Sequence, residues 1–229
     1  MKVLGIESSG ARGGVALLDG DAVLGSRIFE KGMVHGREIA PAIRDLLDAA
    51  KLRPEEIDLV AVDLGPGSYT GLRVGLAAAK GLALALSKPV VGVSSLDAIA
   101  EAGRGLARVL CAALDAKWEQ IYGAVYEDGV RRTEYLAEKP ADFVARVPKG
   151  ALVLGDALDA FGGLFRDIVP GPREYWDPRP EAVARLGRRL HESGVRVDAA
   201  TLVPLYLRKT EAELKFGAVE DRRPKSEDR

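Results

Sequence analysis

The sequence has few of the residues that form disulfides and common zinc sites. Its 229 residues include one cysteine, Cys111, and two histidines, His35 and His191, which lie far apart. A single cysteine can form no disulfide within the chain, which favours a reducing compartment. Zinc sites of the usual cysteine and histidine kinds are therefore not expected, whereas sites built from carboxylates remain open.

Long apolar runs and an excess of one charge are also missing. The most apolar stretch, Val74–Leu86, contains Lys80 and is shorter than the roughly 18–20 residues that a membrane span needs. The first residues hold one basic residue and a short apolar run, unlike a targeting signal. The chain has 33 basic and 34 acidic residues, and its net charge of −1 argues against binding of nucleic acid by this chain without a partner. We expect a soluble, cytoplasmic protein without membrane contact.

The pattern of apolar residues predicts two halves with a similar order of elements. Each half begins with three strands joined by short turns, after which helices and strands alternate. The elements expected in the first half are strands over 2–8, 15–18 and 22–29, a helix over 36–50, a strand over 57–64, a helix over 69–87, a strand over 89–93 and a helix from Ser94 or Ser95 to Ala102. Those expected in the second half are strands over 108–114, 120–126 and 130–136, a short helix over 140–147, a strand over 151–155 and an amphipathic helix over 181–193.

The order of these elements narrows the fold class. It predicts an α/β protein with a duplicated actin-like ATPase or RNase H-like fold, because a doubly wound sheet would not begin with an antiparallel meander. We expect an N-terminal domain over residues 1–103 and a C-terminal domain over residues 104–216, whose last segment could return to the first domain. Residues 217–229 are almost all charged and predict a disordered tail.

A glycine-rich segment, Gly65–Gly71, lies between a predicted strand and a predicted helix. Glycines permit a tight turn and close approach of a ligand, and Ser68 or Thr70 can cap the helix, whose amides and dipole favour phosphate. The segment lacks the spacing of a Walker A loop or a dinucleotide fingerprint. Two interpretations stay open: a nucleotide-binding loop with contacts from Gly65, Gly67 and Ser68, or a strand-to-helix turn without a ligand.

Glu7 and Ser8, at the end of the first predicted strand, are the other candidates for nucleotide binding. A carboxylate and hydroxyls here could face phosphate and magnesium, as in the phosphate-binding hairpins of actin-like ATPases. The alternative is a polar turn with a capping serine. Asp115 ends the corresponding strand of the second half and has the same two interpretations.

Longer blocks of the sequence resemble a known family. These blocks are Gly5–Ser9, His35–Pro41, Asp63–Ala100, Val109–Tyr126 and Pro204–Lys215. They are similar to the bacterial tRNA threonylcarbamoyladenosine biosynthesis proteins called TsaB or YeaZ. The resemblance spans nearly the whole chain, and GPGSYTGLRVG and PLYLR are its most specific parts.

The resemblance implies a duplicated actin-like fold and a noncatalytic role. Members of the family hold the catalytic subunit TsaD in a complex with an ATPase, TsaE, and the complex transfers threonylcarbamoyl to the tRNA adenosine beside the anticodon. The catalytic relative binds its metal through a pair of histidines, whereas the equivalent stretch here, Val93–Asp97, contains none. The resemblance thus implies no catalytic residue and no metal ligand in this chain, and only indirect contact with tRNA.

The resemblance also implies that the helices expected over 36–50 and 69–87 contact another subunit, either TsaD or a second copy of the chain. The residues assigned to this contact are His35, Ile39, Ile43, Leu46, Leu72, Leu76 and Lys80. An acidic substitution at Leu72 or Leu76 is expected to abolish the complex and leave the monomer folded. The chain is expected to carry no cofactor of its own, although ATP or ADP could bind at the junction with the catalytic subunit.

Glu7 departs from the family, in which many relatives have aspartate at this position. The extra methylene moves the carboxylate outward, which argues against a direct role in binding nucleotide or magnesium. Two other functions stay open: a metallopeptidase or small ATPase acting alone, and a subunit that senses nucleotide without hydrolysing it.

Overall fold

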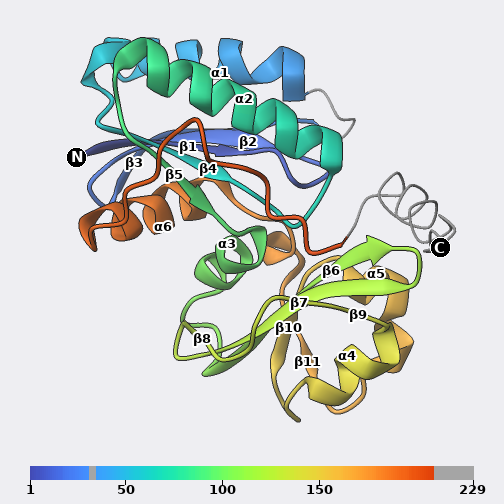
Figure 1. The fold of residues 1–229 in the computed structure, drawn as a ribbon. Helices are drawn as coiled ribbons and strands as arrows, with labels where there is room; N and C mark the ends of the chain where they lie inside the picture. The colour runs from blue at the N-terminus through green and yellow to red at the C-terminus, as the bar shows by residue number, and fades with distance from the viewer. Residues whose placement is uncertain (31–34, 209–229) are drawn as a thin grey trace, which may run out of the picture.

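The computed structural model describes residues 1–30 and 35–208, which form two α/β lobes (Figure 1). The sheet of the first lobe contains, in spatial order, β3 (Ala22–Ile28), β2 (Gly14–Asp19), β1 (Lys2–Glu7), β4 (Leu59–Asp63) and β5 (Val90–Val93). The first three strands pair in antiparallel fashion, whereas β4 and β5 extend the sheet in parallel. The predicted meander followed by alternating helices and strands is confirmed.

Helices cover both faces of this first sheet. α1 (His35–Ala49) and α2 (Tyr69–Leu86) lie on one face, and α6 (Pro180–Glu192) lies on the other (Figure 1). Because successive side chains of a strand point to opposite faces, β1 directs Leu4 and Ile6 toward α1 and α2, and Val3 toward α6. The strand is therefore apolar on both faces, as expected for a central strand between two layers of helix.

The last part of the described chain returns to the first lobe. α6 contacts β1, β2 and β4. Beyond it, Val197 pairs with Val90 at the edge of the sheet, and Leu202 joins the core. Tyr206 then stacks on Tyr69 of α2 with ring centroids 5.3 Å apart. Residues 180–208 thus pack with the first sheet, while the domain boundaries at 103 and 216 stay predictions, the latter outside the described residues.

The second lobe is built on a six-stranded sheet. Its strands, in spatial order, are β11 (Val169–Pro170), β10 (Leu152–Leu154), β6 (Val109–Lys117), β7 (Gln120–Glu127) and β8 (Val130–Arg131), with β9 (Leu136–Glu138) also paired to β7. α4 (Pro140–Arg146) and α5 (Ala157–Phe161) pack on one face around Phe143. α3 (Ser95–Ala102) packs on the other face through Leu96 and Ile99. Short 3₁₀ turns occupy Pro54–Glu56, Gly162–Leu164 and Arg173–Tyr175.

One predicted strand of the second lobe is divided in the structure. The pattern predicts a single strand over 130–136, but β8 and β9 are separate, and the hydroxyl of Thr133 accepts the hydrogen bond of the Val125 amide. A side chain takes the place of a ladder carbonyl there, so the pairing with β7 is interrupted. The sequence pattern also does not predict the short helix α5. The tail predicted over 217–229 lies outside the described residues.

α3 joins the two lobes through two acidic side chains. Glu101 accepts two hydrogen bonds from Arg189 of α6, at 2.8 and 2.6 Å, and one from Arg104 at 2.9 Å. Asp97, one turn earlier, accepts hydrogen bonds of 2.7 Å from the hydroxyls of Tyr126 and Tyr135 in the second lobe.

Among the described helices, none combines the length and apolar character that crossing a membrane requires.

The residues assigned to the partner contact on α1 and α2 differ in burial within this chain, and the contact itself stays a prediction. Four of the assigned side chains are buried within this chain; they are Ile39, Ile43 and Leu76, which belong to the core cluster on the sheet, and Leu72. Leu46 is partly buried in the same cluster, and Lys80 donates a hydrogen bond to the Ala200 carbonyl at 3.3 Å. His35 is the first residue of α1, and its side chain lies outside the described part. The buried apolar side chains of each helix pack within this chain, so of the assigned residues with described side chains Leu46 and Lys80 are the more accessible to a partner.

Leu72→Glu is therefore predicted to unfold the chain, in contrast to the expectation from the resemblance. Leu72 is 1% exposed, and an unpaired carboxylate there would cost several kcal/mol, a large part of the stability of a domain. Leu84 lies on the same helix and is 81% exposed, so Leu84→Glu is the matched control and should melt within a few degrees of wild type. Thermal unfolding followed by circular dichroism measures both variants, and a wild-type melting temperature for Leu72→Glu would contradict the burial.

Candidate functional site

Two buried carboxyl groups meet at the ends of β1 and β4. Glu7 and Asp63 are 2% and 0% exposed. The hydroxyl of Ser9 lies 2.7 Å from Glu7 Oε1 and 3.0 Å from Asp63 Oδ2, and that of Ser95 donates to Asp63 Oδ1 at 2.7 Å. The two strands are parallel neighbours, so their carboxyl ends, with these acids, lie at the same edge of the sheet.

Backbone amides complete the environment of both carboxyl groups. Glu7 Oε1 accepts hydrogen bonds from the amides of Ser9 at 2.6 Å and Gly10 at 3.1 Å, and Asp63 Oδ1 accepts one from the Gly65 amide at 2.6 Å. These carboxyl groups are therefore held by groups of the chain itself. Sequence reasoning found Glu7 but missed Asp63, although Asp63 lies near the end of a predicted strand, as Glu7 does.

Burial raises the pKa of Glu7 to about 8 and that of Asp63 to about 6. Loss of hydration is the main cause in both cases, and the charge of Asp63 raises the pKa of Glu7 further, while hydrogen bonds from Ser9 and Gly10 lower it. A carboxyl group with a pKa of about 8 is mostly protonated at neutral pH. Glu7 therefore has little negative charge with which to attract a cation.

The glycine-rich loop packs directly against the β1–β2 turn. The Ser68 amide donates a hydrogen bond to the Ser9 carbonyl at 2.8 Å. A Cβ atom on Gly67 would lie 2.6 Å from that carbonyl oxygen, and one on Gly71 would lie 2.1 Å from the Ser8 carbonyl oxygen. The glycines thus permit the close approach that the sequence suggested, but the group they approach is the chain's own backbone.

The five residues predicted to bind nucleotide differ in exposure. Glu7, Ser8 and Gly65 are buried, Gly67 is exposed and Ser68 is half-buried. The Ser68 hydroxyl accepts a hydrogen bond from the Gly71 amide at 3.2 Å, which confirms the predicted cap of α2. A phosphate approaching from solvent would meet Gly67 and Ser68 but not the other three, so these five residues do not form one open site.

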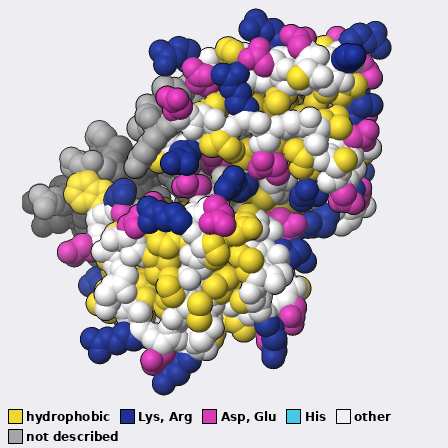
Figure 2. Space-filling view, turned by 180° about the vertical axis from the view of Figure 1, so that it is seen from behind, with side chains coloured by type: hydrophobic (Ala, Val, Ile, Leu, Met, Phe, Trp, Pro, Cys, Tyr) yellow, Lys and Arg dark blue, Asp and Glu magenta, His cyan; other side chains and the backbone are white. Residues whose placement is uncertain are grey.

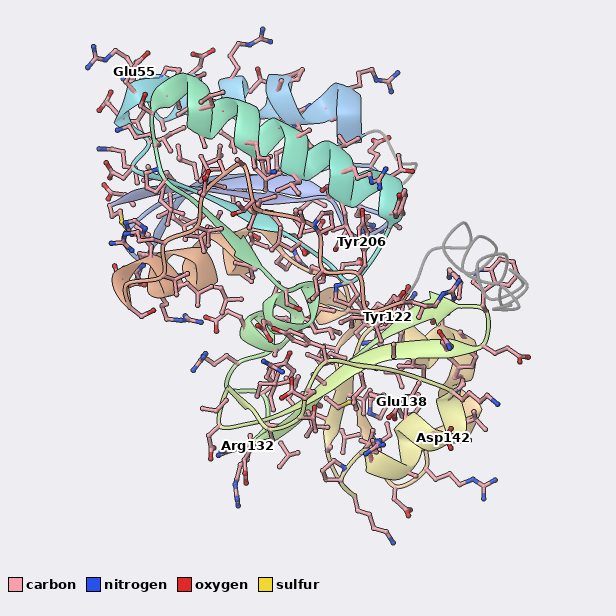
Figure 3. All side chains as sticks on the ribbon, viewed as in Figure 1. Glu55, Tyr122, Arg132, Glu138, Asp142 and Tyr206 are labelled. Atoms are coloured by element: carbon pink, nitrogen blue, oxygen red, sulfur yellow. The ribbon has the colours of Figure 1, made fainter. Side chains whose placement is uncertain are left out.

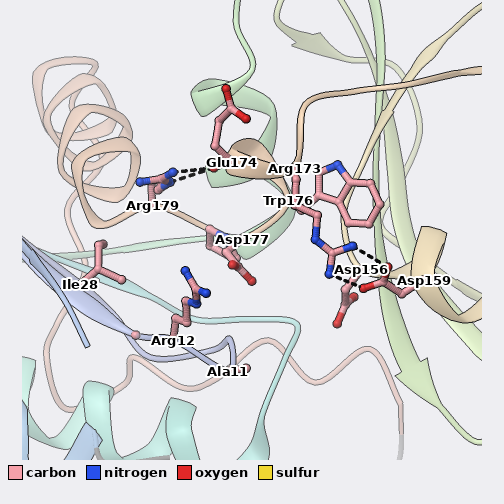
Figure 4. Close-up of a pocket in the computed structure, with 12 residues that line it drawn as sticks. Ala11, Arg12, Ile28, Asp156, Asp159, Arg173, Glu174, Trp176, Asp177 and Arg179 are labelled. Carbon is pink, nitrogen blue, oxygen red and sulfur yellow. Dashed lines mark hydrogen bonds and ion pairs between the residues drawn. The ribbon is translucent and has the colours of Figure 1, made fainter. Parts of the chain in front are cut away.

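A cavity of about 420 Å³ lies between the two lobes (Figure 4). The first lobe contributes the turn that carries Arg12, and Ile28 at the end of β3. The second lobe contributes Asp156, and the rest of the wall comes from the segment 173–179, which precedes α6. The five residues predicted to bind nucleotide are not part of its wall.

Asp115, the counterpart of Glu7 in the second half, lies behind this cavity. Its amide donates to Asp156 Oδ1 at 2.7 Å, and its carboxylate accepts hydrogen bonds from the Lys117 amide and ammonium group at 2.8 and 2.6 Å. Asp115 is thus neutralised by a lysine two residues away, and Asp156 is the carboxylate at this strand edge that lines the cavity.

Comparisons with known proteins support one family. The family model for TsaD, tRNA N6-adenosine threonylcarbamoyltransferase, matches residues 32–160. The chain is 30% identical over 228 residues to TsaB of Bacillus subtilis (strain 168), with 94% of this chain and 98% of that protein covered. It is 34% identical over 222 residues to TsaB of Escherichia coli (strain K12), with 91% and 95% covered.

Solved structures agree with these relatives. A Pseudomonas aeruginosa protein described as similar to the peptidase YeaZ superposes with a TM-score of 0.80 at 25% identity, over 90% of this chain and 99% of that one. Component A of (R)-2-hydroxyglutaryl-CoA dehydratase from Acidaminococcus fermentans, at 10% identity and a TM-score of 0.50, covers 82% of this chain and 98% of its own and shares the fold alone. The predicted duplicated actin-like fold class is confirmed.

The pKa of Glu7 predicts that Glu7→Gln gains stability relative to wild type as the pH rises. A carboxyl group whose pKa is about 8 when folded and 4.5 in its ordinary state stabilises the fold fully at low pH, and this contribution is lost as the pH rises through about 8. Glutamine keeps a carbonyl oxygen for the amides of Ser9 and Gly10 and does not ionise. The difference in unfolding free energy should change by up to about 1.4 kcal/mol per pH unit.

Denaturant unfolding from about pH 5 to about pH 9 measures this difference. Glu55→Gln, at an exposed carboxylate (Figure 3), is the matched control and should differ from wild type by the same amount at every pH. A pH-independent difference for Glu7→Gln as well would contradict the raised pKa.

Proposed function

The chain belongs to the TsaB family of tRNA threonylcarbamoyladenosine biosynthesis proteins, and we propose that it acts there as a noncatalytic subunit that binds and supports a TsaD-like catalytic subunit. The complex, with a TsaE-like ATPase, transfers threonylcarbamoyl to the tRNA adenosine beside the anticodon. This chain contacts the tRNA only through its partners.

The outer face of α2 is the observation that carries the proposal. Leu84 is 81% exposed there, and Ala77, Gly81 and Ala85 lie on the exposed side of the helix, four residues apart. A Cβ atom on Gly81 would meet no other atom within 4 Å. Small residues about one turn apart leave room for the ridge of a second helix, and an exposed leucine beside them gains from being covered. This face fits a helix of another subunit.

α1 lies beside α2 and adds a charged border to this face (Figure 1). The side chains of Arg37 and Arg44 are 79% and 72% exposed, and each lies near an acidic neighbour on the same helix. An apolar centre with a charged rim is the usual composition of a protein–protein interface.

The similarity to the catalytic family supports a partner of the same fold. The matched residues 32–160 include α1, α2 and α3. The chain is also 28% identical over 207 residues to the tRNA N6-adenosine threonylcarbamoyltransferase of Lawsonia intracellularis, covering 79% of this chain and 56% of that protein. Two chains of one fold can pair through equivalent helices, and so can two copies of this chain. A homodimer is therefore the proposed state in isolation.

The start of α3 supports a noncatalytic role. It corresponds to the stretch in which the resemblance places the metal-binding histidines of the catalytic relative. Here Ser94 caps the helix by accepting the Leu96 amide, Ser95 donates to Asp63, and Asp97 accepts from two tyrosine hydroxyls. The polar side chains of this stretch are used in holding the fold together.

The distribution of charge supports an indirect contact with tRNA. Basic and acidic side chains are interspersed over the face shown in Figure 2, without a broad region of one sign. Phosphate binding draws on clustered basic groups, so a chain with mixed charges gains little affinity from the tRNA backbone.

Co-purification tests the proposal. The full-length chain, produced with the TsaD-like protein of its own organism, should keep that protein through gel filtration, and a deletion strain should lose the tRNA modification. Absence of association together with intact modification would show the proposal to be wrong. The alternative, a metallopeptidase or ATPase acting alone, predicts bound metal or ATP turnover in the isolated chain that is lost in Glu7→Gln.

Gly81→Glu is predicted to weaken the complex with the TsaD-like subunit at least about tenfold while the chain stays folded. The position is open in the monomer, and glutamate is a better helix former than glycine. At a helix–helix contact its carboxylate would be desolvated without a partner.

The matched control is Val130→Glu, in β8 of the second lobe, where the side chain is 54% exposed. Isothermal titration calorimetry with the TsaD-like protein compares the variants, and circular dichroism checks that each is folded. Equal affinities for wild type and Gly81→Glu would contradict the proposed surface.

A further inference from the structure

The cavity between the lobes carries charges that the chain balances only in part. Arg173 donates to Asp159 Oδ2 at 2.6 Å, and its guanidinium carbon lies 4.4 Å from the centre of the Trp176 ring. Arg179 donates two hydrogen bonds to the Glu174 carbonyl at 3.1 and 2.6 Å (Figure 4). Two arginines of the wall are therefore already engaged.

Four charged side chains of the wall remain: Arg12, Asp156, Asp177 and Glu174, whose carboxylate points away from Arg12 in Figure 4. Within residues 1–30 and 35–208, Arg12 and Asp177 form no hydrogen bond or ion pair through their charged groups. Asp156 accepts one hydrogen bond, from the Asp115 amide. Figure 4 shows Arg12 extending from the turn of the first lobe toward Asp177, with Asp156 on the other side of the cavity. Arg12 is thus the cationic group of the wall whose donors are not already used within the described part of the chain, and it lies near Asp177 with Asp156 opposite.

The two carboxylates repel each other. Partial loss of hydration raises the pKa of Asp156, and the charges of Asp115 and Asp177 raise it further, while Lys117 lowers it. A positive group between Asp156 and Asp177 would relieve this repulsion, because it favours both ionised forms.

The wall does not suit the magnesium nucleotide that the actin-like fold class implies. Polyphosphate would bring several negative charges close to Asp156 and Asp177, with Arg12 as the one arginine of the wall not already engaged. The amides of Ser9 and Gly10, which a phosphate-binding hairpin would offer, donate to Glu7. The residues present therefore do not fit a nucleotide.

We propose that this cavity binds a free α-amino acid, with its carboxylate on Arg12 and its ammonium group between Asp156 and Asp177. An α-amino acid carries one negative and one positive group on the same carbon atom, which matches the charged side chains Arg12, Asp156 and Asp177. Ile28, Trp176 and Pro178 form the apolar part of the wall that the ligand side chain would contact. A volume of about 420 Å³ lies within the range of small-molecule sites.

Calorimetric titration of the full-length chain with each standard L-α-amino acid in turn tests the proposal. At least one should bind saturably, and methylamine or acetate, which carry only one of its two charged groups, should bind at least about tenfold more weakly. Arg12→Gln and Asp177→Asn should each weaken amino-acid binding at least about tenfold. Arg132→Gln, at an exposed arginine of the second lobe (Figure 3), is the matched control and should bind as wild type does.

Three outcomes would overturn the proposal. They are the absence of saturable binding by every amino acid, binding that is unchanged in folded Arg12→Gln, and magnesium ADP binding that Arg12→Gln abolishes. Arg12 is an exposed turn residue, so its substitution leaves the core intact. Complex formation with the TsaD-like subunit, measured in the same variants, should be unchanged, which separates this inference from the proposed function.

Discussion

The hydrogen-bonded contact between Glu7, Ser9 and Asp63 is the constraint on which the rest of the first lobe depends. It ties the β1–β2 turn to the end of β4, and Ser95 extends it to the start of α3. Burying two acids is unfavourable unless each is hydrogen-bonded or protonated; both are hydrogen-bonded here, and burial raises the pKa of Glu7 to about 8. The close packing of the glycine-rich loop on Ser9 follows from the position in which this network holds the turn.

The sequence predicted most elements, because their apolar periodicity follows directly from which face is buried. It could not predict the exposed face of α2, because that helix is apolar nearly all round and periodicity then gives no direction. Leu72 and Leu84 are equally apolar, yet Leu72 is 1% exposed and Leu84 is 81% exposed. Asp63 was missed for another reason: its partners, Ser9 and Ser95, are 54 and 32 residues away, and such long-range pairs leave no local pattern.

The two lobes use equivalent strand ends differently. Glu7 and Asp63 end the parallel neighbours β1 and β4, and Asp115 and Asp156 lie at the ends of the parallel neighbours β6 and β10. The first pair is enclosed by serines and amides, whereas the second borders the space between the lobes. Duplication thus supplied two similar edges, and the residues around them made one structural and left the other accessible to solutes.

The position of Asp97 and Glu101 on one short helix limits how the lobes can move. Asp97 is hydrogen-bonded to tyrosines of the second lobe and Glu101 to Arg189 of α6, so α3 connects the two lobes through side chains. A rotation of one lobe away from the other would have to break the ion pair of Glu101 with Arg189, and the Glu101 side chain is 7% exposed. Any wider opening of the space between the lobes would therefore cost the hydrogen bonds of Glu101 to Arg189.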